Sequence, residues 1–406
     1  MKKTLNKVLP YTILLISVSS VLQWCSLPIG NTFVWWLLYS FIIFIFLRLK
    51  PNKYTIYPIR IFLLYVVFSA IYGAIYMAEN YWDWKLLINN LMVFLLPLAS
   101  FVFNSPFKLI NLLKCWFRYA WVILLILFPF LGSDAFGRFL VPFTFLSLFL
   151  ALLNKKYLIL TISAYLITII WGSDSRSDMI KFTICILLGI SSLCSCIWKY
   201  KRLIKCLWLG LIISPIILFV LGITNTFNIF KIGEELGIDE KYTMTNSSGE
   251  KYSALTDTRT LLYVEQIESA LKHNYVIFGR SIARGHDSAL FGDFVDEKAG
   301  TSRGERQKCE TSILNIFNYF GLVGVLIYFI IFAKASYMAI NKSSNSYIPI
   351  IGIYVAFRWL YAWVEDFSNF DLNYLFIWIF IGICYSPYFR NMNDIDFKQY
   401  IQKICK

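Results

Sequence analysis

Hydrophobic residues in this chain form long runs that recur from one end to the other, separated by short polar connections. Each run approaches the ~20 residues that an α-helix needs to cross the hydrocarbon core of a bilayer. The pattern predicts an all-α fold, a polytopic membrane helical bundle of about twelve transmembrane helices. We expect the spans at residues 8–26, 31–48, 60–78, 86–103, 117–132, 138–153, 157–171, 179–198, 204–223, 312–333, 347–364 and 372–389.

Lysine and arginine residues are concentrated in alternate connections, and this gives the bundle an orientation. Because cytoplasmic loops collect Lys and Arg, the basic connections are expected to face the cytoplasm together with both termini. The opposite turns are acidic or neutral, and adding or losing one span would destroy the alternation. The basic groups are Arg48, Lys50 and Lys53; Lys108, Lys114 and Arg118; Lys155 and Lys156; Lys199, Lys201, Arg202 and Lys205; Lys334 and Lys342; and Arg390, Lys398, Lys403 and Lys406.

Composition supports the same class of protein. The 406 residues are 58% hydrophobic and 15% charged, too few charges to keep a soluble domain of this length dispersed. The net charge of +14 comes from small basic groups beside the spans, so we expect no nucleic-acid partner. The nine cysteines show neither a disulfide framework nor metal-ligand spacing, so no metal or other cofactor is expected.

The polar composition of residues 224–311 interrupts the hydrophobic pattern and divides the chain. Residues 1–223 form the bundle of spans one to nine, and 224–311 form a large outer (periplasmic) loop with short helices. Residues 312–389 complete the bundle, and 390–406 form a cytoplasmic tail. A long charged insertion between tightly connected membrane helices is where function is expected to reside.

One amphipathic helix is predicted inside this loop, capped by Asp257 and ending near His273. Its apolar face is formed by Leu261, Val264, Ile267 and Leu271, while Arg259, Tyr263 and Gln266 lie on another face. Gly279 then turns the chain into a basic stretch. This stretch contains Arg280, Arg284, His286, Arg303 and Arg306.

The tenth span begins with polar residues on one face. Thr311, Asn315 and Asn318 follow helical spacing, so at this depth they must face protein or water. Gly321 and Gly324 follow and are expected to let a neighbouring helix come close.

Two further arginines lie near the outer face at positions where a charged side chain is energetically unfavourable. Arg358 lies inside the eleventh span, and Arg176 lies at the outer mouth of the seventh and eighth. With the loop arginines and Glu310, they predict an outward-facing basic cavity. Arginine suits phosphate because its planar fork donates paired hydrogen bonds and stays charged when partly desolvated. A lipid-linked phosphate or pyrophosphate is the expected ligand.

Three local patterns resemble the O-antigen polymerase and ligase superfamily of bacterial surface-polysaccharide assembly. Ser173-Asp174-Ser175-Arg176 resembles the family's Ser-x-Ser-Arg, and Arg259 with Phe278-Gly279-Arg280-Ser281 resembles its Arg…Phe-Gly-x-Gly stretch, with Ser281 departing from the last glycine. The segment from Glu310 to Gly321-Leu-Val-Gly324 resembles the family's entry into the span after the large loop. Ligases of the family carry His where Glu310 stands, which favours a polymerase.

The resemblance implies a metal-independent membrane glycosyltransferase in the bacterial inner membrane. Its substrate would be undecaprenyl-pyrophosphate-linked repeat units, polymerised into O-antigen or capsular polysaccharide, with a chain-length regulator and a flippase as partners. Under this hypothesis Arg176, Arg259 and Arg280 hold the pyrophosphate, Arg358 assists, and Glu310 is the general base or positions the acceptor. Further substrate-binding candidates are Arg284, Arg303, Arg306, His286, Tyr263 and Asn315.

Each of these residues also has a purely structural interpretation. Arg176 could anchor a helix end, the loop arginines could form salt bridges, and Arg358 could pair with Glu365 or Asp366. Glu310 could cap the tenth span, and His286 could be a loop hydrogen-bonding residue. Two alternative functions also remain open at this stage: a ligase that transfers glycan to an acceptor, and a flippase of lipid-linked oligosaccharides, which the long outer loop disfavours.

Overall fold

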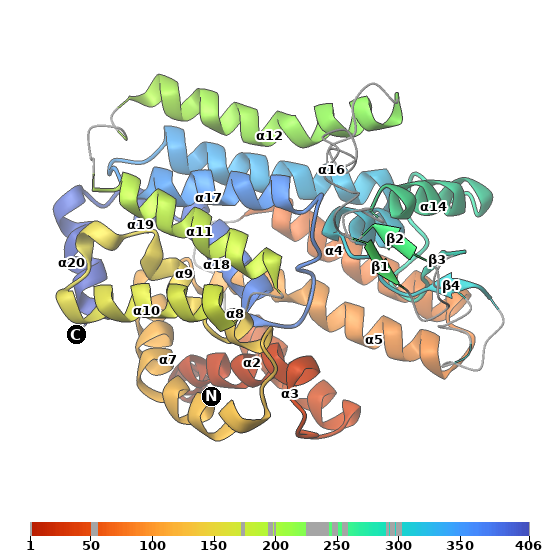
Figure 1. Cartoon of the computed structure of the whole chain (residues 1–406), viewed down its shortest axis with the longest axis horizontal. Helices are drawn as coiled ribbons and strands as arrows, with labels where there is room; N and C mark the ends of the chain where they lie inside the picture. The colour runs from red at the N-terminus through yellow and green to blue at the C-terminus, as the bar shows by residue number, and fades with distance from the viewer. Residues whose placement is uncertain are drawn as a thin grey trace.

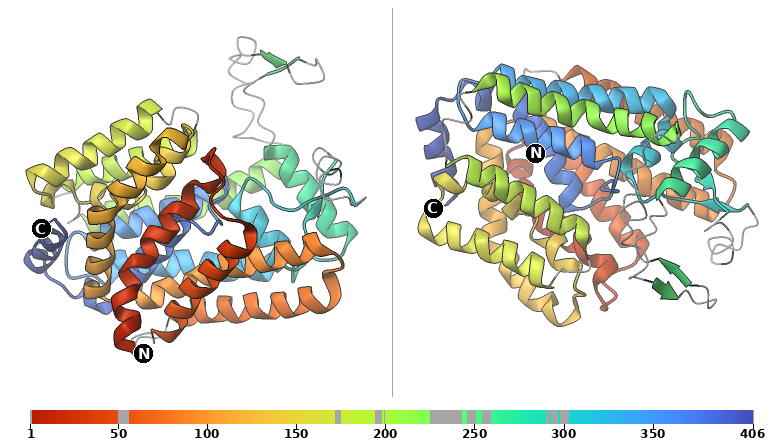
Figure 2. Two further views of the ribbon diagram at one scale, coloured as in Figure 1. Left: turned by 90° about the horizontal axis from the view of Figure 1, so that it is seen from below. Right: turned by 45° about the horizontal axis from the view of Figure 1, so that its top comes forward.

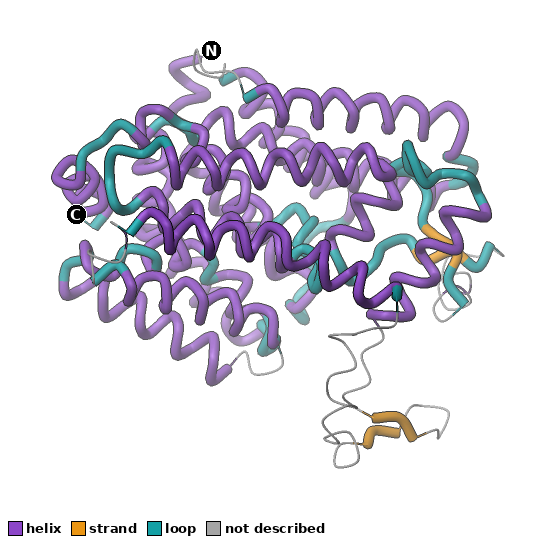
Figure 3. The backbone as a smooth tube through the Cα atoms, turned by 90° about the horizontal axis from the view of Figure 1, so that it is seen from above, coloured by secondary structure: helices purple, strands orange, loops and turns teal. Residues whose placement is uncertain are grey.

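The protein is mostly helical throughout the part of the chain that the structure describes (Figures 1 and 3). The computed structural model describes residues 2–49, 56–171, 175–193, 198, 200–224, 259–289, 292, 297 and 303–405, and the backbone of 243–245 and 251–253. The expected cap Asp257 and the Ser173-Asp174 half of one motif lie outside these residues.

The first half of the chain forms helices connected by short turns. These are α1 (Lys2–Val8), η1 (Leu9–Tyr11), α2 (Thr12–Val21), η2 (Leu22–Trp24), α3 (Thr32–Arg48), α4 (Tyr57–Tyr72), η3 (Gly73–Met77), α5 (Tyr81–Leu95), η4 (Leu96–Leu98), α6 (Ala99–Val102), α7 (Pro106–Leu127), η5 (Phe128–Phe130), α8 (Ala135–Phe139), α9 (Pro142–Ser147), η6 (Leu150–Leu152), α10 (Lys155–Trp171) and α11 (Arg176–Ser191).

The second half contains the described parts of the large loop and the longest helix. Its elements are α12 (Lys201–Ile223), β1 (Thr243–Thr245), β2 (Lys251–Ser253), α14 (Arg259–Lys272), β3 (His286–Asp287), β4 (Glu305–Arg306), α16 (Ser312–Asn341), α17 (Ile348–Tyr361), α18 (Leu372–Tyr385), α19 (Pro387–Arg390) and α20 (Asp394–Ile404). The strands form two antiparallel ribbons, β1–β2 and β3–β4. Helix α16 packs against α4, α12, α17 and α18, and Figure 2 shows α12, α16 and α17 side by side.

Six helical stretches within the described residues are long and apolar enough to cross a membrane, so this is a multi-pass membrane protein by the length and composition of its helices. Helices α3, α17 and α18 are apolar but shorter. The count of about twelve spans remains a prediction. The six long stretches are Lys2–Trp24, Tyr57–Met77, Tyr81–Val102, Pro106–Phe130, Lys201–Gly222 and Ser312–Asn341.

The predicted spans 117–132 and 138–153 differ most from the observed helices, and α16 also runs past the predicted end at 333 to Asn341, so Lys334 lies on a helix. The segment 138–153 is not one helix but parts of α8, α9 and η6, because Pro142 lacks the N–H of a continuous helix and starts a new one. Its side chains are almost all buried, and irregular backbone at membrane depth is tolerated only inside protein. Helix α7 begins at Pro106 rather than near residue 117, so Lys108 and Lys114 lie on a helix instead of in a loop.

Some connections contact one another within each of the two predicted sets. At one end, Gly132 N donates to Trp24 O at 2.8 Å, and the Arg303 guanidinium contacts Asp83 at 3.0 Å. At the other end, Asn154 Nδ2 donates to Cys405 O at 3.1 Å. Figure 1 shows α14 with the β3–β4 ribbon at one end of the bundle and α20 at the other. We call the end with α14 the outer end; its orientation in a cell remains a prediction.

Helix α16 is broken at Gly321, whose φ of 63° and ψ of −164° lie outside the helical region. The break frees the amide groups that follow, and the loop satisfies them: Leu322 N donates to Val276 O at 2.9 Å and Val323 N donates to Ile277 O at 3.1 Å. The expectation that the glycines admit a neighbouring helix was therefore wrong. The segment that approaches Gly321 is the loop around Gly279. A β carbon added to Gly279 would lie 2.4 Å from Phe320 N.

Candidate functional site

A buried group of charges lies where the outer ends of α11 and α17 meet. Lys181 and Asp178 are 3% and 1% exposed, and their charged atoms lie 2.6 Å apart. The Lys181 ammonium also lies 3.6 Å from a carboxylate oxygen of Glu365, in the connection between α17 and α18. Ser175 Oγ donates to Asp178 at 3.0 Å. We call Asp178, Lys181 and Glu365 the buried triad.

Sequence reasoning missed the buried triad, although a signal was present. Lys181 falls inside the predicted span 179–198, and an ionisable residue within a span is a functional-site candidate by default. The prediction singled out Arg176, five residues earlier. In the structure Arg176 is exposed at the first residue of α11, while Asp178 and Lys181 point into the protein.

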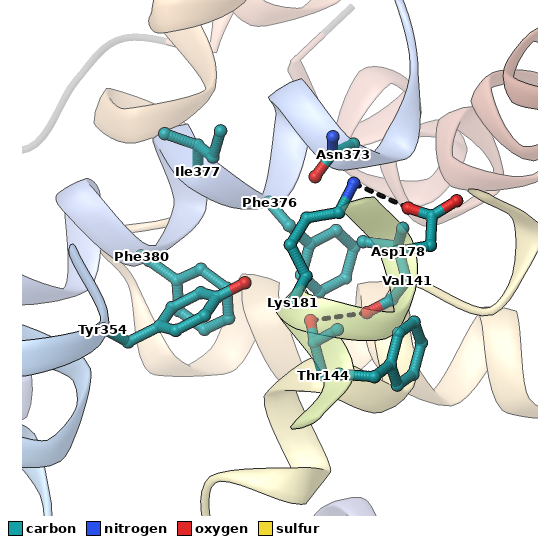
Figure 4. A pocket seen from close by; sticks show the side chains of 10 residues that line it. Val141, Thr144, Asp178, Lys181, Tyr354, Asn373, Phe376, Ile377 and Phe380 are labelled. Atoms are coloured by element: carbon teal, nitrogen blue, oxygen red, sulfur yellow. Dashed lines mark hydrogen bonds and ion pairs between the residues drawn. The ribbon is translucent and has the colours of Figure 1, made fainter. Parts of the chain in front are cut away.

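A small cavity of about 10 Å³ adjoins Asp178 and Lys181 (Figure 4). Tyr354 from α17 and Asn373 from α18 also line it. A space of this size and polarity suits one water molecule. The cavity is therefore a polar interior space and not, in this conformation, an opening for a large ligand.

The guanidinium of Arg358, on α17, is a further buried charged group near the triad. It is 1% exposed, and none of its three nitrogens makes a hydrogen bond within the described residues, although the Tyr354 hydroxyl lies beside it. Its guanidinium carbon lies 4.7 Å from the ring centroid of Phe367 and 5.9 Å from that of Tyr361. The structural alternative, pairing with Glu365 or Asp366, is not observed.

Both acids have other partners instead. Glu365 faces Lys181, and Asp366 pairs with Lys308 at 2.7 Å. Burial alone would raise the pKa of Asp366, yet the adjacent Lys308 ammonium holds that pKa below its usual value. Lys308 thus fastens the end of the large loop to the connection between α17 and α18.

The arginines of the large loop converge, but on carboxylates. Arg280 donates to Glu305 at 2.9 Å and to Asp287 at 3.2 Å, and Arg284 Nε donates to Glu305 at 3.0 Å. Hydrogen bonding to Glu305 raises the pKa of Arg284. These contacts match the salt-bridge alternative, so a phosphate at Arg280 or Arg284 would have to displace Glu305.

Arg303 and Arg306 also bind carboxylates, but different ones. Arg303 binds both oxygens of Asp83, at 3.1 and 3.0 Å, and also Glu79, which fastens the loop to the start of α5. Arg306 donates to Glu310 at 3.0 Å. The Glu310 side chain is 49% exposed and contacts an arginine rather than the amides of α16.

Three other predicted site residues hold the loop in place. Both amide atoms of Asn315 bind the backbone of Cys309, at 2.7 and 2.9 Å. Tyr263 Oη donates to Trp363 O at 2.8 Å. His286 is 1% exposed and pairs with Arg306 across the β3–β4 ribbon. The backbone of Arg259 starts α14, but its side chain lies outside the described residues.

Glu310 lies at the rim of the bundle, by which we mean the exposed surface of its outer end, and it is connected to the buried triad through the backbone. Ser312 N donates to the carbonyl oxygen of Glu365 at 3.1 Å, and Ser312 is two residues from Glu310. The outer end of α16 therefore brings an exposed carboxylate next to the connection that carries Glu365. The structure thus places the predicted residue Glu310 beside the buried triad, and it places Arg280 with Arg284 in a separate cluster.

Burial lowers the pKa of His286 to about 4 from 6.5, and the neighbouring Arg306 charge acts in the same direction. A histidine held neutral in the folded state loses stability as pH falls, because the unfolded chain binds the proton more tightly. We expect the free energy of unfolding of the β3–β4 ribbon to fall by up to about 3 kcal/mol between pH 6.5 and pH 4. Hydrogen exchange of residues 284–289, corrected for intrinsic rates, measures this.

The matched variant is His286→Gln, which keeps a polar side chain but cannot take up the proton. Asp287, whose pKa is lowered by Lys272 and His273 against the effect of burial, titrates at lower pH than this window. Equal loss of protection in wild type and His286→Gln would contradict the assignment of the pH dependence to His286.

Comparison with family models, with curated proteins and with solved structures finds no match for this chain. The fold and the site together define its class: a multi-pass helical membrane protein with a cluster of buried charged side chains at one end of the bundle.

Proposed function

We propose that this protein is a metal-independent membrane glycosyltransferase that polymerises undecaprenyl-pyrophosphate-linked repeat units into O-antigen or capsular polysaccharide. The motif resemblance motivates the substrate class. The observation that carries the proposal is Arg358, an enclosed guanidinium without a hydrogen-bonded partner among the described residues. A buried guanidinium without a hydrogen-bonded carboxylate costs several kcal/mol, and an anionic group bound to it would offset that cost.

The proposed reaction transfers the growing chain from its pyrophosphate carrier to an incoming repeat unit. The bond between the anomeric carbon and the pyrophosphate oxygen breaks, and the electron pair leaves with the pyrophosphate. A new bond forms from the acceptor hydroxyl oxygen to the anomeric carbon. The proton of that hydroxyl passes to the Glu310 carboxylate, which is half exposed at the rim.

Arg358 and Lys181 have different parts in this proposal. Lys181 already faces two carboxylates, Asp178 and Glu365, whereas Arg358 has its donors available for the leaving group. Donors fixed in a water-poor interior stabilise developing negative charge more than donors in water do. Because Arg358 is enclosed here, helices packed against α17 would have to move apart for the pyrophosphate to enter.

The test compares surface polysaccharide from a deletion strain complemented with wild type, Arg358→Met or Glu310→Gln. Arg358→Met keeps the side-chain volume and removes the charge. We expect polymerisation to fall by about 100-fold or more, leaving core plus a single repeat unit on a gel. Because the unpaired charge is removed, the thermal stability of Arg358→Met should be equal to or higher than that of wild type.

Arg118→Ala, an exposed arginine on α7, is the matched control and should leave the polysaccharide ladder unchanged. A full ladder from Arg358→Met at wild-type protein level contradicts the proposed role of Arg358. Loss of the single unit with accumulation of lipid-linked polymer would indicate a ligase, and single units trapped on the cytoplasmic leaflet would indicate a flippase.

A further inference from the structure

A second hollow lies at the outer end of the bundle, between α3, α5 and the turn that joins α2 to α3. Its volume is about 480 Å³, within the range of ligand sites. We call it the aromatic groove. Its lining includes Cys25, Trp35, Trp36, Tyr39, Lys85 and Asn89.

The wall contributed by α3 is aromatic and held in place by hydrogen bonds. Trp35 Nε1 donates to Ile29 O at 2.7 Å, and Trp36 Nε1 donates to Asn89 Oδ1 at 2.6 Å. The hydroxyls of Tyr39 and Ser19 form a hydrogen bond of 2.6 Å. These bonds orient the rings before any ligand is present, which reduces the entropy lost on binding.

The facing wall from α5 is polar. Lys85 and Asn89 are four residues apart and therefore lie on one face of the helix. Asn89 uses its oxygen for Trp36, which leaves its amide N–H groups as donors. The Lys85 ammonium lies 4.7 Å from the Trp82 ring centroid and forms no ion pair within the described residues.

An aromatic wall opposite amide and ammonium donors matches the chemistry of a carbohydrate. A pyranose has flat C–H faces that pack on aromatic rings, and a rim of hydroxyls that accept and donate hydrogen bonds. The ammonium adds a partner for a sugar carboxylate or phosphate. A hydrocarbon chain would leave the donors of Lys85 and Asn89 without partners.

The groove adjoins the connection that carries Glu365. The Tyr39 ring stacks on Phe370 with centroids 4.0 Å apart, and Ser19 Oγ donates to Phe370 O at 2.6 Å. Phe370 is five residues from Glu365, which limits their Cα separation to about 18 Å. An oligosaccharide in the groove could therefore extend to the rim near Glu310.

We propose that the aromatic groove binds the glycan of the acceptor repeat unit. This assignment rests on the proposed function for the identity of the glycan, but its test does not depend on turnover. Trp36 and Lys85 are the residues that determine binding. They are specificity-determining residues rather than catalytic ones, because in this proposal they contact the glycan and not the reacting atoms.

Cys25 lines the groove and reports its occupancy directly. The probe is the free oligosaccharide released by hydrolysis from the host strain's own surface polysaccharide, added to purified protein in lipid nanodiscs. Labelling of Cys25 by a soluble maleimide is followed by mass spectrometry of its peptide, with a soluble cysteine-containing peptide in the same sample as the reference. We expect the oligosaccharide to slow Cys25 labelling at least about 5-fold, with labelling of the reference peptide unchanged.

Trp36→Ala and Lys85→Met should lose this protection, each measured against its own rate without sugar. Trp36→Phe keeps a ring and should retain part of it, which separates loss of binding from misfolding. Trp84→Ala is the matched control, because Trp84 is exposed on α5 beside Lys85 but does not line the groove.

Protection in wild type and in Arg358→Met alike would support the groove even if the polymerase proposal fails. Absence of protection in a protein that polymerises would overturn the groove and leave the polymerase standing. Protection by phospholipid headgroups that the oligosaccharide cannot reverse would also overturn it, and would assign the groove to lipid.

Discussion

Gly321→Ala is expected to detach the large loop from the bundle and destabilise the protein by at least about 3 kcal/mol. The φ of 63° with ψ of −164° is open only to glycine at low energy. A β carbon at residue 321 would also lie 2.3 Å from Ile277 O, a backbone atom that cannot rotate away. Relieving the clash requires breaking the hydrogen bonds from Leu322 and Val323 to the loop. Thermal unfolding and limited proteolysis near residues 275–284 measure the two effects.

Gly210→Ala provides the matched control. Gly210 lies in α12, and a β carbon there would meet nothing within 4 Å among the described residues. An alanine in the interior of a helix is favoured over glycine by roughly 0.5–1 kcal/mol, so this variant should be neutral or slightly stabilised. Equal melting temperatures for the two variants would show that the loop does not depend on the break in α16.

The sequence predicted the apolar helices well because their signal is local. Hydrophobic runs define α10, α12 and α18 to within a few residues at their starts, since membrane-crossing length and composition require no knowledge of neighbours. The polar face of α16 was also predicted correctly: Thr311, Asn315 and Asn318 are all buried against protein. Such residues have no other low-energy place in a membrane helix.

Features that depend on distant contacts were not predictable in this way. The break at Gly321 exists because the loop around Ile277 supplies acceptors for the freed amides, and a pair of glycines alone also fits close helix packing. Helix α14 shows the same limit. Its apolar residues Leu261, Val264 and Leu271 are about half exposed or more, while Gln266 and Ser269 are buried against the bundle. Hydrophobicity predicts a face, but the tertiary partner decides which face is covered.

In the candidate site, too, some features follow from the local sequence and others depend on distant contacts. The unusual placement of Arg358 was evident from the sequence, because a charge inside a span is rare. The partners of the loop arginines were not, since the chain offers many acids within the same loop. Only the fold brings Glu305 to Arg280 and Arg284 and leaves Arg358 without a hydrogen-bonded partner among the described residues.

Glu305→Gln is expected to have the second large effect on stability, about 3–5 kcal/mol, because it leaves two buried guanidinium groups without their shared countercharge. The side chains of Arg280, Arg284 and Glu305 are 8%, 11% and 11% exposed, so solvent screens them little. We expect faster hydrogen exchange in residues 280–289 and 303–310 and a lower melting temperature. Glu268→Gln, an exposed acid on α14, should change stability by less than about 0.5 kcal/mol.

A double-mutant cycle separates the pair itself from the general effect of losing a carboxylate. Arg284→Met removes one of the two cations, so Glu305→Gln should cost less in that background than in wild type. A coupling of about 1–3 kcal/mol is expected for groups in direct contact. Additive effects would mean that Arg284 is compensated by Glu79 and the Met77 carbonyl oxygen instead, the other groups within its reach. Arg284 would then be held at the outer end independently of Glu305, and only Arg280 would depend on that carboxylate.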